Sequence, residues 1–177
     1  MGRLTLHSPL VSVEATVREL HLADAQLLAD AARDMAHMRG PLPIPSSLDD
    51  ALRLVTQFET LRAAELGNLF GVWGPGDSEL VGAASILLSE PDDQVAEGAM
   101  WARPDRKSRY AMAHGVDLIV QEIHNTMQIL RVWVSMDSID PLARHLLWST
   151  MFNEEAEIRH ADGSVTVRYS SIARART

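Results

Sequence analysis

Apolar residues recur every three or four positions along three stretches of the sequence, and this spacing predicts amphipathic helices. Asp24 and Ser47 stand where the first two of these helices need N-caps. Asp50 lies three residues after Ser47 and completes a pattern that resembles a capping box. A fourth, shorter helix is predicted over 141–150, with Asp140 at its N-cap. The apolar positions of the three longer helices are Leu27, Leu28, Ala31, Met35 and Met38, then Leu48, Leu52, Val55, Phe58 and Leu61, then Met112, Val116, Ile119, Val120, Ile123 and Met127.

Shorter apolar runs between turn-forming residues predict strands, and residues 4–13 predict a further edge strand or an arm. Only turn-like segments connect three consecutive runs in the middle of the chain, so those three strands are expected to be antiparallel. Asp162-Gly163 predicts a hairpin turn near the C-terminal end. The predicted order is β, α, α, β, β, β, α, β, α, β, β, in a single domain over residues 1–177. The predicted strands span 15–20, 69–73, 79–88, 95–102, 129–134, 154–159 and 165–172.

The segment between the strand at 95–102 and the third long helix is rich in cations. Pro104 to Arg109 is predicted to be a polar turn that carries Arg106, Lys107 and Arg109, with the helix starting near Tyr110. A polar loop that opens a helix gathers unpaired N–H groups and the positive end of the helix dipole, so it can bind a diphosphate. The alternative is an ordinary connection with a solvated basic turn, and this segment alone favours that alternative.

Composition narrows the function only coarsely. The chain has 177 residues, 46% of them apolar, and a net charge of -8. The negative charge argues weakly against nucleic-acid binding. The chain has no cysteine, which excludes disulfides and thiolate chemistry. The histidines form no metal motif. With no membrane-length apolar run and no signal peptide, a cytoplasmic protein without a membrane partner is expected.

Four pieces of the sequence resemble the GNAT superfamily of acyl-CoA-dependent N-acyltransferases, nearest the branch of the ribosomal-protein N-terminal acetyltransferases. The resemblance implies an α/β (α+β) fold: a mixed, mostly antiparallel sheet of six to seven strands, about four helices and splayed central strands. It spans roughly residues 16–173. The four pieces are V-R-E-L-H-L-A-D-A-Q-L-L at the start, Val81-Gly82 in E-L-V-G-A-A-S-I, the strand-loop-helix at 131–152, and the last hairpin with Arg159, Asp162-Gly163 and Tyr169.

The resemblance also implies where ligands bind. In this family the acyl-pantetheine of acetyl-CoA lies in the gap between the splayed strands, and its diphosphate lies on the loop that opens the central helix. Glu97 is the candidate general base and Tyr110 the candidate acid, against the simpler interpretations of a strand-end carboxylate and a packing tyrosine. Trp101 and Trp133 either form core or line the acyl slot. The implied cofactor-binding residues are Trp101, Ala102, Arg106, Lys107, Ser108, Arg109, Tyr110, Ala111, Asp140 and Ala143.

Several positions depart from the family pattern. The central glycine of the diphosphate loop is replaced by Arg109 or Tyr110, and that glycine lets the backbone approach the phosphates closely. A side chain there either blocks the site or points away while Lys107 and Arg109 bind the phosphates directly. On the predicted fourth helix, Asp140, Ala143 and Leu147 replace the family's Asn, Ser and Tyr, and Met151 replaces its Gly.

Three hypotheses follow. The first is an N-acetyltransferase that moves an acetyl group from acetyl-CoA to a primary amine of a small molecule or a protein N-terminus. The second is a silent GNAT-fold protein that has lost acetyl-CoA binding and serves as a binding or structural subunit. The third is an acyltransferase with a donor other than CoA. The fold is compatible with a homodimer, although no residue pattern indicates one. Asp137, His114 and His145 are further polar residues expected beside the site.

Overall fold

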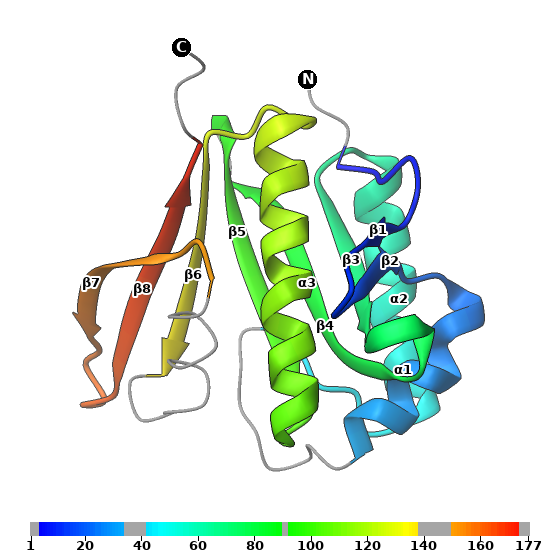
Figure 1. Cartoon of the computed structure of the whole chain (residues 1–177). Helices are drawn as coiled ribbons and strands as arrows, with labels where there is room; N and C mark the ends of the chain where they lie inside the picture. Colours follow the sequence, from blue (N-terminus) through cyan, green and yellow to red (C-terminus); the bar gives the residue numbers. More distant parts are fainter. Residues whose placement is uncertain (1–3, 34–41, 90–91, 138–149, 174–177) are drawn as a thin grey trace.

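The computed structural model describes residues 4–33, 42–89, 92–137 and 150–173. The described chain forms a mixed sheet covered by helices on both faces (Figure 1). The strands are β1 (Leu10–Val11), β2 (Thr16–Glu19), β3 (Gly67–Trp73), β4 (Leu80–Ser89), β5 (Asp92–Ala102), β6 (Arg131–Asp137), β7 (Asn153–Arg159) and β8 (Val165–Ile172). The α-helices are α1 (Ala25–Ala32), α2 (Leu48–Ala63) and α3 (Arg106–Asn125), and short 3-10 helices span Leu22–Asp24 and Pro75–Asp77.

The strand order across the sheet is β1-β2-β3-β4-β5-β6-β8-β7. Neighbouring strands are antiparallel except for β5 and β6, which are parallel and are joined by the crossover through α3. The predicted mixed, mostly antiparallel sheet is therefore confirmed, including the antiparallel arrangement of β3, β4 and β5. The sheet has eight strands because part of the predicted edge strand or arm pairs as the two-residue β1. The predicted helix over 141–150 lies almost wholly outside the described residues.

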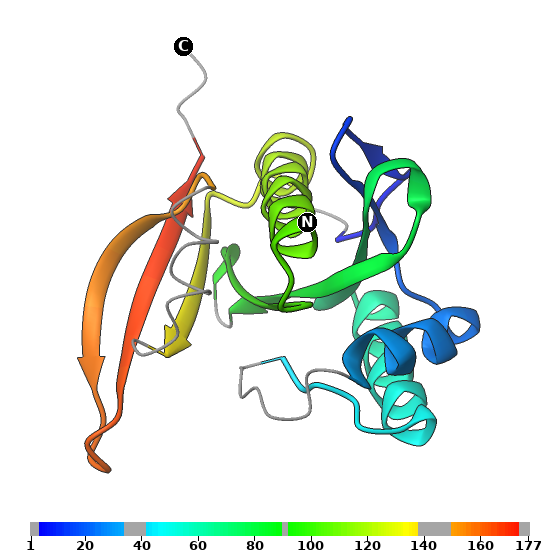
Figure 2. The ribbon, with the colours of Figure 1, turned by 60° about the horizontal axis from the view of Figure 1, so that its bottom comes forward.

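Two apolar clusters lie on opposite faces of the sheet. Figure 2 shows α3 on one face and α1 with α2 on the other, beneath the half of the sheet that contains β2, β3 and β4. The α3 side is packed by the apolar residues that the helical spacing predicted, from Met112 to Ile123. Gly115 allows this packing to be close, because a Cβ there would come within 2.5 Å of Val72 Cγ1 on β3. The faces on which the helices pack thus follow from the periodicity of the sequence.

Three helix starts can be compared with the sequence prediction. Ser47 caps α2 as predicted, with its hydroxyl accepting from the Asp50 N–H at 3.1 Å. Asp24 does not cap α1 with its side chain; it accepts from the His21 N–H at 3.1 Å and lies at the end of a 3-10 helix. The prediction for α3 was wrong: the helix begins at Arg106, so the predicted polar turn through Arg109 is its first turn. Met35 and Met38 lie outside the described residues.

None of the described helices combines the length and the apolar character that crossing a bilayer requires. Within the same described ranges, no group of three or more His, Asp or Glu side chains is placed to hold a metal ion.

Candidate functional site

The parallel strands β5 and β6 separate in the middle of the sheet. Their pairing runs from Val95 with Arg131 to Gly98 with Val134. Beyond this point β5 continues to Ala102 and β6 continues to Asp137, without pairing to each other. In Figure 1 the two strands are adjacent at the top and diverge downward, toward the end where α3 begins. The result is a gap between two strands of one sheet.

Backbone amide groups face this gap from both sides. The Arg103 N–H bonds to a β4 carbonyl at 2.8 Å. Because backbone direction alternates along a strand, the N–H and C=O groups of Met100 and Ala102 are directed toward β6. On the other side, the Leu130 C=O accepts from the Ala173 N–H, directly after β8, at 2.8 Å. The same alternation therefore directs the backbone groups of Ser135 toward β5. An extended ligand with its own amides could bond here as an added strand.

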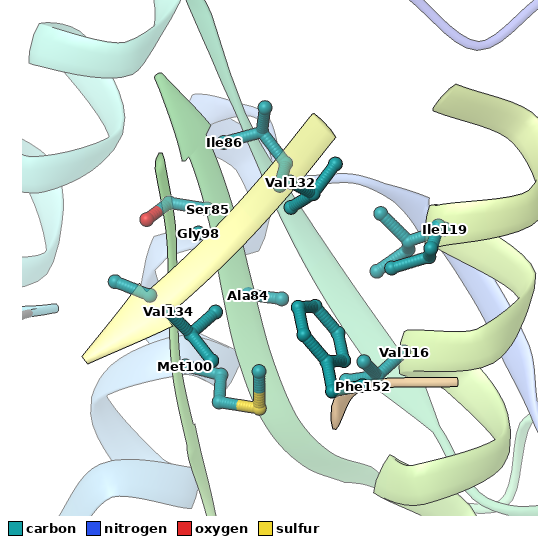
Figure 3. A pocket seen from close by; sticks show the side chains of 12 residues that line it. Ala84, Ser85, Ile86, Gly98, Met100, Val116, Ile119, Val132, Val134 and Phe152 are labelled. Atoms are coloured by element: carbon teal, nitrogen blue, oxygen red, sulfur yellow. The ribbon is translucent and has the colours of Figure 1, made fainter. Parts of the chain in front are cut away.

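A small apolar pocket lies beside the gap on the α3 side. Figure 3 shows Phe152 between α3 and the divergent strands, with Val116 and Val134 around it. Phe152 is only 6% exposed, and the cavity that remains measures about 10 Å³, the room of one water molecule. The further lining residues are Ala84, Ser85, Ile86, Gly98, Ala99, Met100, Ile119, Val120 and Val132.

Glu97 lies one residue before the point where the strands separate. It pairs with Leu87 on β4 and with Trp133 on β6. Paired residues point to the same face, and Leu87 packs in the cluster of α1 and α2, so Glu97 and Trp133 face that side. Burial raises the pKa of the Glu97 carboxyl, and the positive charge of Arg168 offsets part of this effect. A carboxylate with a raised pKa is suited to accept a proton near neutral pH.

The first turn of α3 is capped by the chain itself. Asp105 is the N-cap, and its Oδ1 accepts from the Ser108 N–H at 2.9 Å. Burial acts to raise the pKa of the Asp105 carboxyl, but hydrogen bonding by Ser108 and Lys107 and the charge of Arg103 outweigh it, so this pKa is lowered. The Arg109 N–H bonds to the Asp105 carbonyl at 3.1 Å. The Asp105 carboxylate therefore already occupies the Ser108 N–H, one of the first-turn donors that an anion would need here.

The predicted cofactor-binding side chains near this turn differ in placement. Arg106 and Lys107 are exposed, Ser108 and Ala111 are buried, and Tyr110 is 59% exposed. The Tyr110 ring stands edge-on to His114 at 4.6 Å between centroids, and Tyr110 is not a lining residue of the apolar pocket.

Trp101 is 5% exposed and packs on the α1 and α2 side, whereas the next residue, Ala102, is half-buried at the end of β5. Asp137 is exposed at the end of β6. The structure therefore brings Glu97 and Trp133 together and places Tyr110 on the first turns of α3. Asp140, Ala143, Leu147 and His145 lie outside the described residues.

No protein-family profile and no curated protein sequence matches this chain. Solved structures do match. Ribosomal-protein-S5-alanine acetyltransferase from Vibrio fischeri is 14% identical with a TM-score of 0.78, covering 96% of this chain and 99% of that chain. Ribosomal L7/L12 α-N-protein acetyltransferase in complex with coenzyme A is 14% identical with a TM-score of 0.80, covering 96% and 100%. A GNAT-family acetyltransferase from Bacillus anthracis is 12% identical with a TM-score of 0.74, covering 94% and 99%. This chain has the GNAT fold. At these identities the likeness concerns the fold, and its neighbours include the ribosomal-protein acetyltransferases expected from the sequence.

A GNAT fold implies acetyl-CoA, and the described residues fit only part of that molecule. The gap between β5 and β6 fits the extended pantetheine arm, because backbone groups of Met100, Ala102 and Ser135 are directed into it. The start of α3 does not fit a diphosphate bound by backbone N–H groups, because the Asp105 carboxylate already accepts there. The exposed side chains of Arg106 and Lys107 are the cations in this region that could contact phosphates.

Three residues of this site were missed by the sequence analysis. Asp105 carries a signal that could have been used, since Asp three residues before Ser108 is an N-cap pattern. Phe152 was noted only as the end of a family motif. Arg168 carries no local signal, because its position over the Trp133 ring, 4.4 Å from guanidinium to centroid, depends on the pairing of β6 with β8.

Proposed function

We propose that this protein is an N-acyltransferase that moves an acetyl-sized group from a pantetheine thioester to a primary amine. The observation that carries the proposal is the position of Glu97, a carboxylate of raised pKa at the point where β5 and β6 separate. The gap supports it because it supplies amide groups to an extended thioester arm. The GNAT fold, which this chain shares with solved acetyltransferases, supports this chemistry, although fold alone does not establish function.

The proposed reaction needs one proton acceptor. The neutral amine nitrogen attacks the thioester carbonyl carbon, the C–S bond breaks, and the thiolate leaves and takes up a proton. Glu97 accepts the proton that the amine loses. Its half-buried position keeps the carboxylate less solvated than a surface glutamate, which raises its basicity. General-base catalysis of this kind contributes about 10²–10⁴-fold in rate.

The size of the apolar pocket supports acetyl as the transferred group. The cavity beside Phe152 is about 10 Å³ and has room for about one water-sized group. A longer acyl chain directed to this side would have to displace Phe152 or Met100. We therefore assign the donor to the class of acetyl thioesters, with acetyl-CoA as the first to test and acetyl-pantetheine as the donor without phosphates.

The test is an assay of amine-dependent thiol release from both donors, with a panel of primary amines. Glu97→Gln is expected to lower kcat by about 100-fold or more while donor binding, measured by calorimetry, is unchanged. Glu157→Gln is the matched control, because Glu157 is an exposed carboxylate on β7. Absence of amine-dependent release with every donor, or full activity of Glu97→Gln, would overturn the proposal.

A second candidate is a silent GNAT-fold binding protein. The Asp105 cap favours it, because a carboxylate at the head of α3 repels the diphosphate of CoA. The two candidates differ in one measurement. A silent protein with a closed donor site binds neither acetyl-CoA nor acetyl-pantetheine, whereas the proposed enzyme binds at least the phosphate-free arm.

A further inference from the structure

The face of the sheet beside Glu97 carries an arginine that forms no ion pair with the residues the structure describes. Arg168 on β8 lies over the Trp133 ring, with 4.4 Å between the guanidinium carbon and the ring centroid. Its Nε is buried without a hydrogen-bond partner. Across the described ranges, no hydrogen bond or ion pair joins this guanidinium to another residue, and its charge acts to lower the pKa of the Glu97 carboxyl. A half-buried guanidinium in this state is unusual in a chain of net charge -8.

Other arginines of the same sheet are paired. Arg131 lies on the same face, two residues before Trp133, and forms an ion pair with Glu155 on β7. Arg159, near the hairpin, pairs with Glu157 at 3.2 Å. Arg168 therefore differs from Arg131 and Arg159 in forming no ion pair within the described ranges and in lying over an aromatic ring. Such a stacked guanidinium presents a fixed donor edge to a carboxylate or a phosphate.

The geometry also relates this arginine to the proposed base. Glu97 and Trp133 are direct neighbours across the β5–β6 pair, and the Arg168 guanidinium covers Trp133. Arg168 lies on β8, one strand beyond Trp133, and its positive charge acts on the Glu97 carboxyl. The helices α1 and α2 lie under the other half of the sheet, as Figure 2 shows, and leave this half to other contacts. An amine beside Glu97 would place a nearby substituent over Trp133.

We propose that the acceptor is a small zwitterion, whose primary amine lies at Glu97 and whose carboxylate or phosphate binds Arg168 above Trp133. This inference rests on the proposed acyl transfer and adds the chemical class of the acceptor. The positive charge of Arg168 has a second effect, since it disfavours the ammonium form of the amine and so favours the nucleophile. Amines without an anionic group, such as polyamines, lack the group that Arg168 recognises.

Binding is tested without any turnover by labelling the four tryptophans with 5-fluorotryptophan and recording fluorine NMR spectra. Trp133→Phe identifies the Trp133 signal. β-Alanine and O-phosphoethanolamine are the anionic probes, which separate carboxylate from phosphate recognition, and ethanolamine is the neutral probe. The Trp133 signal is expected to shift with an anionic probe and to stay in place in Arg168→Met, which keeps the contact with the ring. No shift with either anion, or an equal shift in Arg168→Met, overturns the inference.

Kinetics separate this inference from the function on which it rests. For an acceptor pair of anionic and neutral amines, Arg168→Met is expected to raise KM at least tenfold for the anionic amine alone. The comparison is the KM of one amine for Arg168→Met divided by the KM of the same amine for the unaltered protein. Differences in pKa between the amines therefore cancel. Arg131→Met is the matched control, because the same face loses a charge that is already paired with Glu155. Transfer with no preference for anionic amines would overturn the inference and leave the enzyme. A shift of the Trp133 signal without any acyl transfer would overturn the proposed enzymatic activity and leave the anion-binding site at Arg168.

Discussion

Asp105 Oδ1 accepts a hydrogen bond from the Ser108 backbone N–H at 2.9 Å, at the head of α3, where the sequence resemblance predicts a diphosphate site. The interaction predicts how much of CoA the protein recognises. If the cap holds, the phosphates add nothing, and acetyl-CoA and acetyl-pantetheine bind with similar affinity. Asp105→Ala removes the carboxylate and frees its donors, so affinity for acetyl-CoA should rise about tenfold, or ~1.4 kcal/mol, with acetyl-pantetheine unchanged.

Calorimetry with both donors measures this difference. Ser47→Ala is the control, since it removes the cap of α2, lowering stability by about 1 kcal/mol, and leaves α3 intact. Much tighter binding of acetyl-CoA than of acetyl-pantetheine by the unaltered protein would show that the phosphates are bound despite Asp105.

Glu97 should lower the stability of the folded protein at neutral pH. Burial raises its folded pKa above the unfolded value of about 4.3, so the ionised form is less favourable in the folded state. This unfavourable contribution is complete above the folded pKa and disappears below the unfolded one. Glu97→Gln should therefore raise Tm at pH 7 by up to about 2 °C, with the gain vanishing near pH 4. Thermal unfolding at a series of pH values measures it, and a lower Tm at pH 7 would contradict it.

Phe152 should limit the length of the acyl group. Replacing it with Ala enlarges the pocket against α3, so propionyl and butyryl thioesters should become better donors relative to acetyl. The same change removes a buried ring and should lower the free energy of unfolding by about 3–5 kcal/mol. Phe58→Ala is the control, because Phe58 is equally buried in the cluster under α2. If both variants keep the same donor preference, Phe152 does not set chain length.

Asp117 on α3 holds the turn that precedes Phe152. Its Oδ1 accepts from the Met151 N–H at 2.9 Å. Burial raises the pKa of Asp117, and the Met151 N–H and the charge of His114 offset part of that rise. Asp117→Asn keeps an acceptor and removes the buried charge, so it should equal or exceed the original protein in Tm at pH 7. Asp117→Ala loses the bond and should unfold at a lower temperature. The opposite order would mean that the charge itself stabilises the turn.

The order of elements was predictable because core positions repeat along the sequence. The apolar spacing from Met112 to Ile123 located α3, and the run around Val81 located β4. The start of α3 was not predictable in this way, because Arg106 to Arg109 place no large apolar residue in the first turn. The apolar spacing therefore gives no signal there. Only the capping side chain of Asp105 marks it.

The candidate site was predictable only in part. Glu97 was identified through the resemblance, since a glutamate in a strand has no local mark of its surroundings. The pair of Arg168 and Trp133 is separated by 35 positions in sequence and meets only because β6 pairs with β8. The raised pKa of the Glu97 carboxyl depends on its burial in the folded sheet, which Arg168 partly offsets. Contacts of this kind follow from tertiary structure and leave no pattern along the chain.

The short parallel pairing of β5 and β6 also makes this junction a seam in the sheet. Only four residue pairs join the two strands, between β1–β5 on one side and β6–β8 on the other. The amide protons of Met100, Ala102 and Ser135, directed into the gap, should exchange rapidly with deuterium in the free protein. A ligand that bonds to them acts as a missing strand and should slow their exchange together. The seam is thus expected to close on binding, so that occupancy of the site strengthens the sheet as a whole.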